Sequence, residues 1–159
     1  MAKFIYRMQS ILNVKEKLET QAKQEFAAAK AALDAEQEKL LQLLARKAAY
    51  EEAAEALLTG SLKVREIMTN QAAIERIEEY IEDQKARIRI AEELLEAARN
   101  KLREIMQERK MHEKLKEHAF EAFVSEEKRQ EGKEVDELTS YTYGQRIMEK
   151  AAMPAGGDA

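Results

Sequence analysis

Residues 58–62 read Leu-Thr-Gly-Ser-Leu, and this short stretch decides the fold that we expect. Gly60 stands alone between two long stretches that contain neither glycine nor proline, residues 1–59 and 61–131. A glycine can take the left-handed conformation that ends a helix, and the serine after it can cap the start of the next helix. Two long helices joined by so short a turn must run antiparallel. The sequence therefore predicts a helical hairpin that turns at 59–61.

The second arm of the hairpin has a clear seven-residue repeat. The first set of repeating positions is Ile67, Ile74, Ile81, Ile88, Leu95 and Leu102. The second set is Ile77, Gln84, Ala91, Ala98 and Ile105. Consecutive heptads of this kind are typical of a coiled-coil seam. At the next repeat the seam positions hold Arg109 and His112, after which the pattern shifts to Leu115, Ala119 and Phe123, as at a stutter.

The first arm is less regular. One register is set by Phe4, Met8, Ile11, Leu18 and Ala22. A second, displaced by about one residue from the first, is set by Phe26, Leu33, Leu40, Leu44 and Leu58. Folding the chain at Gly60 should place Phe4 near His118 and Leu33 near Ile88, and two helices alone should leave some apolar residues exposed.

These patterns predict an all-α protein, a long antiparallel two-helix coiled-coil hairpin over residues 1–150. We expect the first helix at about 4–58 and the second at about 62–131 or beyond. Residues after about Phe120 should overhang without a partner helix, and Gly132 and Gly144 should interrupt that overhang. Residues 151–159 are expected to form a disordered tail.

Composition excludes several classes of function. Charged residues make up 36% of the chain and the net charge is −4, with no basic block of the kind that nucleic-acid binding requires. There is no cysteine, so disulfides and Cys-ligated zinc are excluded, and a cytosolic setting is expected. No apolar run suits a signal peptide or approaches the length of about 20 residues that spans a membrane. We therefore expect membrane association only through a partner.

Catalytic and metal-binding patterns are missing from the sequence. The run His-Glu-Lys-Leu-Lys-Glu-His at 112–118 looks like a zinc-protease motif, but its histidines are spaced so that they lie on different faces of a helix. No glycine-rich phosphate loop is present, and the carboxylates have no pocket that could shift their pKa values. The sequence predicts a protein that is not an enzyme and that holds no cofactor or metal.

Two segments go beyond a generic coiled coil and resemble the FliJ family of bacterial flagellar type III export proteins. The first is Phe-Ile-Tyr-Arg-Met-Gln-Ser-Ile-Leu-Asn-Val-Lys-Glu-Lys-Leu-Glu at residues 4–19, an alternating aromatic start that runs into a helix. The second combines Glu-Lys-Leu-Lys at 113–116 with Glu-Gly-Lys-Glu-Val-Asp-Glu-Leu at 131–138. The resemblance spans residues 4 to about 145, although Gly132 interrupts the second segment.

The resemblance implies a stalk similar to the gamma subunit of rotary ATP synthases. Such a protein inserts the end of the hairpin that bears the termini into the hexameric ring of the flagellar export ATPase, and promotes ring assembly and activity. It also contacts the cytoplasmic domain of the membrane export-gate protein and escorts export chaperones. The implied location is the cytoplasm, at the inner face of the cell membrane.

The resemblance also suggests contact residues. Those for the ATPase ring are Phe4, Tyr6, Met8, Ile11, Leu12, Lys114, Leu115, Asp136 and Glu137. Those for the export gate are Ala73, Ile77, Tyr80 and Gln84. Packing competes with these roles, because Phe4, Met8 and Ile11 have seam spacing and could pack on Leu115 and Phe123. Tyr6 and Leu12 fall off that register and should face outward.

Two other functions fit the same pattern. The chain could be the equivalent stalk of a virulence-type secretion system. The aromatic N-terminal motif favours the flagellar system over it, but only because that motif resembles the flagellar family. It could also be a purely structural coiled-coil spacer. A prefoldin-like arm would need β-strands, and no strand pattern interrupts the hairpin.

Overall fold

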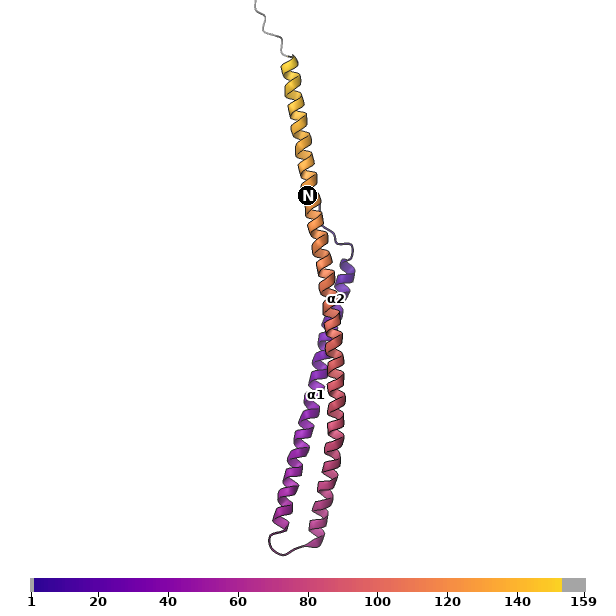
Figure 1. The fold of residues 1–159 in the computed structure, drawn as a ribbon, viewed down its shortest axis with the longest axis vertical. Coiled ribbons are helices and arrows are strands. Elements are labelled where there is room, and N and C mark those ends of the chain that lie inside the picture. Colours follow the sequence, from indigo (N-terminus) through magenta and orange to yellow (C-terminus); the bar gives the residue numbers. More distant parts are fainter. Residues whose placement is uncertain (1, 153–159) are drawn as a thin grey trace, which may run out of the picture. The chain divides into compact units, whose positions relative to one another are not determined.

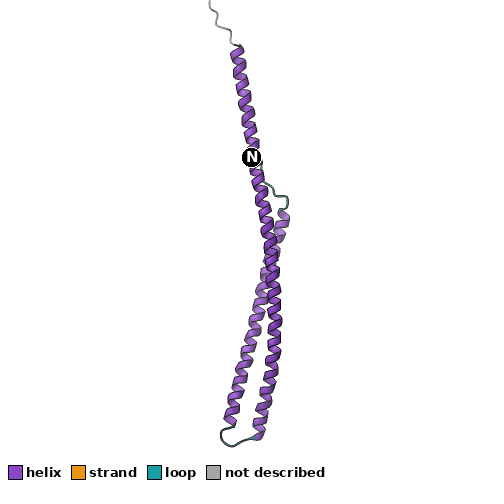
Figure 2. Cartoon of the chain, in the orientation of Figure 1, coloured by secondary structure: helices purple, strands orange, loops and turns teal. Residues whose placement is uncertain are grey.

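A computed structural model describes residues 2–152, and these form two helices without any strand (Figures 1 and 2). Helix α1 spans Gln9–Leu57 and helix α2 spans Val64–Ala152. By the density of its contacts the chain divides into two units. The hairpin unit is residues 13–109, and the terminal unit comprises residues 2–12 and 110–152 of the described chain. The predicted two-helix fold is confirmed, while the domain bounds of 1–150 stay a prediction.

The turn between the helices is built around Gly60. Its φ angle is 104°, the one positive φ value among residues 2–152, as the left-handed conformation predicted for a helix end requires. The hydroxyl of Thr59 donates to the carbonyl oxygen of Ala56 at 2.9 Å and so caps the last turn of α1. Ser61 does not cap α2, because α2 begins three residues later and its first turn bonds to the carbonyl of Lys63.

In the hairpin unit, α1 and α2 lie side by side and run antiparallel (Figure 1). Ion pairs between the helices fix their register. Lys15 pairs with Glu108 at 2.6 Å, Lys101 with Glu25 at 2.9 Å and Lys47 with Glu78 at 3.4 Å. Residues progressively later in α1, at 15, 25 and 47, pair with residues progressively earlier in α2, at 108, 101 and 78, as antiparallel alignment requires.

The α2 seam follows the predicted heptads. Its most buried residues are Ile77, Ile81, Gln84 and Ala91, and the other predicted positions from Ile67 to Ile105 are half-buried. The predicted stutter is wrong, because Leu115 is 47% exposed while Lys116 is half-buried. The heptad therefore continues through Lys116, whose long aliphatic stem can line a seam while its ammonium reaches water.

The α1 seam is one regular heptad pattern, and the prediction of two displaced registers is wrong. Every residue of the two repeating sets is buried or half-buried. The first set is Leu12, Glu19, Phe26, Leu33, Leu40, Lys47 and Ala54, and the second is Lys15, Ala22, Ala29, Glu36, Leu43, Tyr50 and Leu57. Four charged members hide this repeat from a search for apolar spacing. Ile11, Leu18, Leu44 and Leu58, which were expected on the seam, are exposed.

The charged seam residues have partners inside the hairpin. Glu19 forms an ion pair with Arg109 across the seam and another with Lys23 at 3.4 Å on its own helix. The side-chain amide of Gln84 donates to the carboxylate of Glu36 and, at 2.9 Å, to the backbone carbonyl oxygen of the same residue. Buried polar groups carry a large penalty unless they are hydrogen-bonded, so these layers are stable only in the correct register.

In the terminal unit, residues 2–8 precede α1 and pack on α2 without being helical. The ring of Phe4 lies 5.3 Å from that of Phe120, edge to face, and 5.4 Å from that of Phe123. The predicted packing of Phe4 on Phe123 is confirmed, although Phe4 sits slightly beyond the expected level of His118. The helical start predicted at residue 4 is wrong by about one turn.

Helix α2 continues through Gly132 and Gly144, so the breaks predicted there are wrong. Neither glycine has a positive φ value, and both have helical neighbours on each side. All residues from Lys128 to Lys150 except Gly144 are exposed, which confirms an overhang. It begins several residues later than the predicted Phe120, because Phe4 packs on Phe120 and Phe123. Of the predicted disordered tail, Ala151 and Ala152 belong to α2, and residues 153–159 lie outside the described chain.

Candidate protein-binding surfaces

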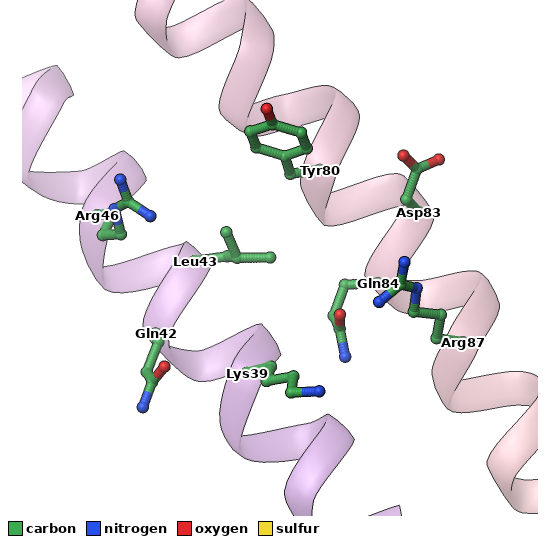
Figure 3. Close-up of a pocket in the computed structure, with 8 residues that line it drawn as sticks. All are labelled: Lys39, Gln42, Leu43, Arg46, Tyr80, Asp83, Gln84 and Arg87. Carbon is green, nitrogen blue, oxygen red and sulfur yellow. The ribbon is translucent and has the colours of Figure 1, made fainter.

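One concave surface runs along the hairpin unit beside Tyr80, and we call it the Tyr80 groove. It consists of two adjoining cavities of about 440 and 370 Å³ that share Arg46 and Tyr80. The first cavity is lined by Lys39, Gln42, Leu43, Arg46, Tyr80, Asp83, Gln84 and Arg87 (Figure 3). The second is lined by Arg46, Tyr50, Thr69, Ala72, Ala73, Arg76, Ile77 and Tyr80.

Both helices supply the walls of the groove. Figure 3 shows Leu43 reaching from α1 toward α2, with Gln84 extending from α2 into the same space. Tyr80 flanks the seam and leaves 51% of its surface exposed, whereas Ile77 and Gln84 are 4% and 5% exposed. The floor is therefore packed seam, and Tyr80 forms an accessible wall. A half-exposed tyrosine offers a partner both an apolar ring and a hydroxyl.

The electrostatics of the groove are dominated by cations. Lys39, Arg46, Arg76 and Arg87 line it, against the single carboxylate of Asp83. Beside it, the hydrogen bond from Gln84 holds the pKa of Glu36 below its usual value, and Lys39 adds to this at 3.4 Å. Glu36 therefore stays ionised. It pairs with Lys39, and the charge of Arg87 also lowers its pKa, whereas Arg46, Arg76 and Arg87 form no ion pair within 4 Å among residues 2–152.

The four residues predicted for the export gate come together in this groove. Ala73 and Ile77 line one cavity, Gln84 lines the other, and Tyr80 lines both. Ile77 and Gln84 also serve the seam, as their register predicted. The prediction missed the wall contributed by α1, including Arg46 and Tyr50. Once the charged positions of the α1 seam are recognised, the antiparallel register places those residues opposite Tyr80.

The residues predicted for the ATPase ring all lie in the terminal unit, in two kinds of environment. Phe4 and Tyr6 are half-buried. The prediction that Tyr6 faces outward is wrong, because its hydroxyl is buried, without a hydrogen-bond partner in the described chain. Leu12 is only 2% exposed, so the prediction that it faces outward is wrong, because it occupies the first heptad position of the α1 seam. The exposed members are Met8, Ile11, Lys114, Leu115, Asp136 and Glu137.

Exposed apolar residues of the terminal unit give it a second candidate surface. Ile5, which the sequence did not single out, is 79% exposed beside the predicted contact residues. A shallow depression of about 720 Å³ lies along α2 and includes Lys114 and Leu115. Exposed apolar residues rimmed by charges are typical of protein-binding surfaces. No sequence signal singled out Ile5, because the sequence predicted a helix from residue 4, whereas α1 begins at Gln9.

The histidines do not form a metal centre in this arrangement. His112 occupies a half-buried seam position, and His118 faces solvent with its Nδ1 atom 3.5 Å from a carboxylate oxygen of Glu121. Within residues 2–152, no three potential ligands gather in a group that could hold a metal ion. Neither α1 nor the described length of α2 is apolar enough over a sufficient stretch to cross a membrane.

Comparison with known sequences identifies the family of the chain. The sequence model of the flagellar FliJ protein family matches residues 4–147. The chain belongs to the FliJ family. The chain is therefore a component of flagellar-type protein export. No curated protein sequence matches the chain significantly.

A solved structure supports the fold of this FliJ-family chain. The structure of a "putative YscO homolog CT670" from Chlamydia trachomatis superposes with a TM-score of 0.69 at 22% sequence identity. The alignment covers 92% of this chain and 99% of the other. At this identity the similarity concerns the fold, a pair of long helices, and carries no information on partners.

Proposed function

We propose that this FliJ-family chain is a central, non-enzymatic stalk of the flagellar export ATPase ring. The observation that carries the proposal is the family match, which extends over residues 4–147 and so includes the terminal unit and the hairpin unit. In this proposal the terminal unit enters the ring and promotes its assembly and activity. The protein acts in the cytoplasm and reaches the inner face of the membrane through the export apparatus.

The hairpin unit provides the second contact in this proposal. The Tyr80 groove binds the cytoplasmic domain of the membrane export-gate protein, with Tyr80 as the accessible anchor. Export chaperones bind the remaining exposed surface and are escorted to the gate. Two exposed surfaces in two separate units support a protein that holds more than one partner.

ATPase stimulation tests the role of the terminal unit. The rate of ATP hydrolysis by the purified export ATPase is measured against added chain. Ile5→Ala with Leu115→Ala should reduce the stimulation at least threefold, because both side chains are exposed there and apolar anchors dominate interface energy. Leu12 is unsuitable for this test, since truncating a buried leucine would destabilise the fold by about 2–5 kcal/mol.

The matched control is Ile90→Ala with Leu94→Ala. These residues are also exposed apolar positions, but they lie in the hairpin unit outside the Tyr80 groove. The control should keep full stimulation. Tyr80→Ala should also keep it, while losing the gate domain in a parallel pull-down. If the unmodified chain does not change the ATPase rate, the result favours the structural-spacer alternative over the stalk.

A swimming assay addresses the system in which the chain works. Deletion of its gene should abolish swimming in soft agar, and the unmodified gene should restore it. Loss of secretion of virulence proteins with normal swimming would instead favour the alternative of a virulence-type stalk.

A further inference from the structure

We propose that the Tyr80 groove binds an acidic protein segment, and that Arg46, Arg76 and Arg87 are the residues that select it. The proposal rests on the proposed function, because the partner there is the export gate, and it adds the chemistry that the partner must present. The segment should carry carboxylates spaced around an aromatic or apolar anchor that packs on Tyr80.

The charges of the groove favour an anionic partner. Four cations line it and only one carboxylate opposes them, although acidic residues outnumber basic ones in the whole chain, whose net charge is −4. The groove is thus a local cationic region on an acidic protein. A charge distribution of this kind steers oppositely charged partners toward one site.

The three arginines are available for binding. Several cations of the hairpin unit outside the groove pair with glutamates, among them Lys15, Lys47, Lys101 and Arg99. Arg46, Arg76 and Arg87 line the groove and form no ion pair within 4 Å among residues 2–152, although Arg87 also feels the charge of Glu36. A guanidinium presents a planar set of donors that matches a carboxylate with two parallel hydrogen bonds, so these residues suit carboxylate recognition better than lysines would.

The shape of the groove favours a protein segment over a membrane or a nucleic acid. On α2 the lining residues extend from Thr69 to Arg87, which corresponds to roughly 27 Å at 1.5 Å per residue. This length accommodates about five turns of a helix or a stretch of about eight extended residues. A concave, two-helix surface with tyrosines in its wall follows the pattern of a partner segment lying in a groove, whereas a flat anionic membrane would also approach the acidic faces around it.

The first test measures binding of the purified gate cytoplasmic domain to the full chain by titration calorimetry at several salt concentrations. The test variant combines Arg46→Gln, Arg76→Gln and Arg87→Gln. Its affinity should fall at least tenfold, and its dependence on salt should become shallower, because ionic contacts are screened by salt. A variant that is merely less well folded would bind more weakly, but its affinity would depend on the salt concentration as steeply as that of the unmodified chain.

The control variant combines Arg65→Gln, Arg89→Gln and Arg103→Gln. It has the same change of charge at exposed positions of the hairpin unit outside the groove. Its affinity should change less than twofold, and both variants should keep the helical circular dichroism spectrum. Equal losses in the two variants would overturn the proposal, because net charge rather than the groove would then govern binding.

A second test separates this inference from the proposed function. Synthetic 18-residue peptides with a central tryptophan and four glutamates are compared with peptides that carry glutamines instead, using fluorescence anisotropy. If the gate domain does not bind but the acidic peptides bind through the three arginines, the gate assignment fails and the groove chemistry stands. If the binding of neither the gate domain nor the acidic peptides depends on these arginines, the proposal is overturned. Stronger arginine-dependent binding to vesicles of phosphatidylglycerol would also overturn it, in favour of a lipid surface.

Discussion

At the scale of single residues, the charged members of the seam determine how the two helices align. Glu19 occupies a seam position with only 6% of its surface exposed and meets Arg109 of the other helix. A carboxylate at such a position loses most of its hydration, and its partner compensates only in one register. Apolar layers alone would tolerate a shift of the helices more easily than this pair does.

Removing Glu19 should therefore be strongly destabilising. Glu19→Ala should lower the free energy of unfolding by about 3 kcal/mol, because the seam loses both the ion pair between Glu19 and Arg109 and a packed side chain. Urea unfolding followed by circular dichroism measures the change. Replacing both residues by leucine should restore most of the stability, since an apolar pair at a seam is often as stable as an ion pair.

The exposed pair Glu96 and Arg99, at 3.0 Å on one helix, is the control. Glu96→Ala should change the free energy of unfolding by about 0.5 kcal/mol or less, because exposed pairs contribute little. Similar losses for Glu19→Ala and Glu96→Ala would contradict the buried position of Glu19.

Glu36 should make stability depend on acid pH. The hydrogen bond from Gln84 holds the pKa of Glu36 below its usual value in the folded chain. The stabilisation is therefore complete above the ordinary pKa of a glutamate, about 4.3, and is lost as the pH falls through the lowered folded value. Urea unfolding between pH 3 and pH 7 should show a shallower loss of stability at acid pH for Glu36→Gln than for the unmodified chain.

The matched variant for this measurement is Glu38→Gln. Glu38 is exposed and has no hydrogen bond or ion pair within residues 2–152. Its pH profile should coincide with that of the unmodified chain. If the two variants have the same profile, the bond between Gln84 and Glu36 does not contribute to acid sensitivity.

At the scale of helices, the sequence predicted α2 better than α1. The α2 seam is lined mostly by isoleucine, leucine and alanine, so apolar spacing alone located it. The α1 seam carries Lys15, Glu19, Glu36 and Lys47, and apolar spacing therefore assigned Leu12 to the wrong face. These charges belong to the seam only because α2 supplies partners for them, and that pairing depends on the folded register. The same dependence explains why the α2 side of the Tyr80 groove was predicted and its α1 side was not.

The three glycines between residues 2 and 152 show that the presence of a glycine does not by itself end a helix. Gly60 was correctly assigned to the turn, but Gly132 and Gly144 were wrongly taken for helix breaks. A glycine inside a helix weakens it by only about 0.5–1 kcal/mol relative to alanine, and the neighbours of these two residues favour a helix. Only a position with a positive φ value, as at Gly60, requires glycine.

The same substitution should consequently have opposite effects at two glycines. Gly132→Ala should slow amide hydrogen exchange in the overhang severalfold, because alanine favours the helix and its added methyl group meets no atom within 4 Å. Gly60→Ala should instead lower the free energy of unfolding by about 1 kcal/mol, since the φ value of 104° is strained for any residue with a Cβ atom. Hydrogen exchange and urea unfolding distinguish the two effects, and a stabilised turn variant would contradict the conformation of Gly60.

At the scale of the whole molecule, the concave surfaces described above are open grooves on helices, with volumes of about 440 Å³ in the Tyr80 groove and about 720 Å³ beside Leu115. Catalysis usually depends on a site that excludes water and positions reacting groups. The purified chain should therefore release no phosphate from ATP above the buffer background in a coupled assay. Phosphate release that follows the 18.3 kDa chain through size exclusion would contradict this expectation.

The overhang of α2 also has a consequence for how long the protein survives in a cell. From Lys133 to Tyr143 lies a helical stretch that no other described part of the chain covers, and an isolated helix of such length is only marginally stable in water. Segments that unfold locally are the usual sites of proteolytic cleavage. Chains that have not been incorporated into a complex would thus be degraded first, and the cellular amount of the protein would follow the number of complexes available to shelter it.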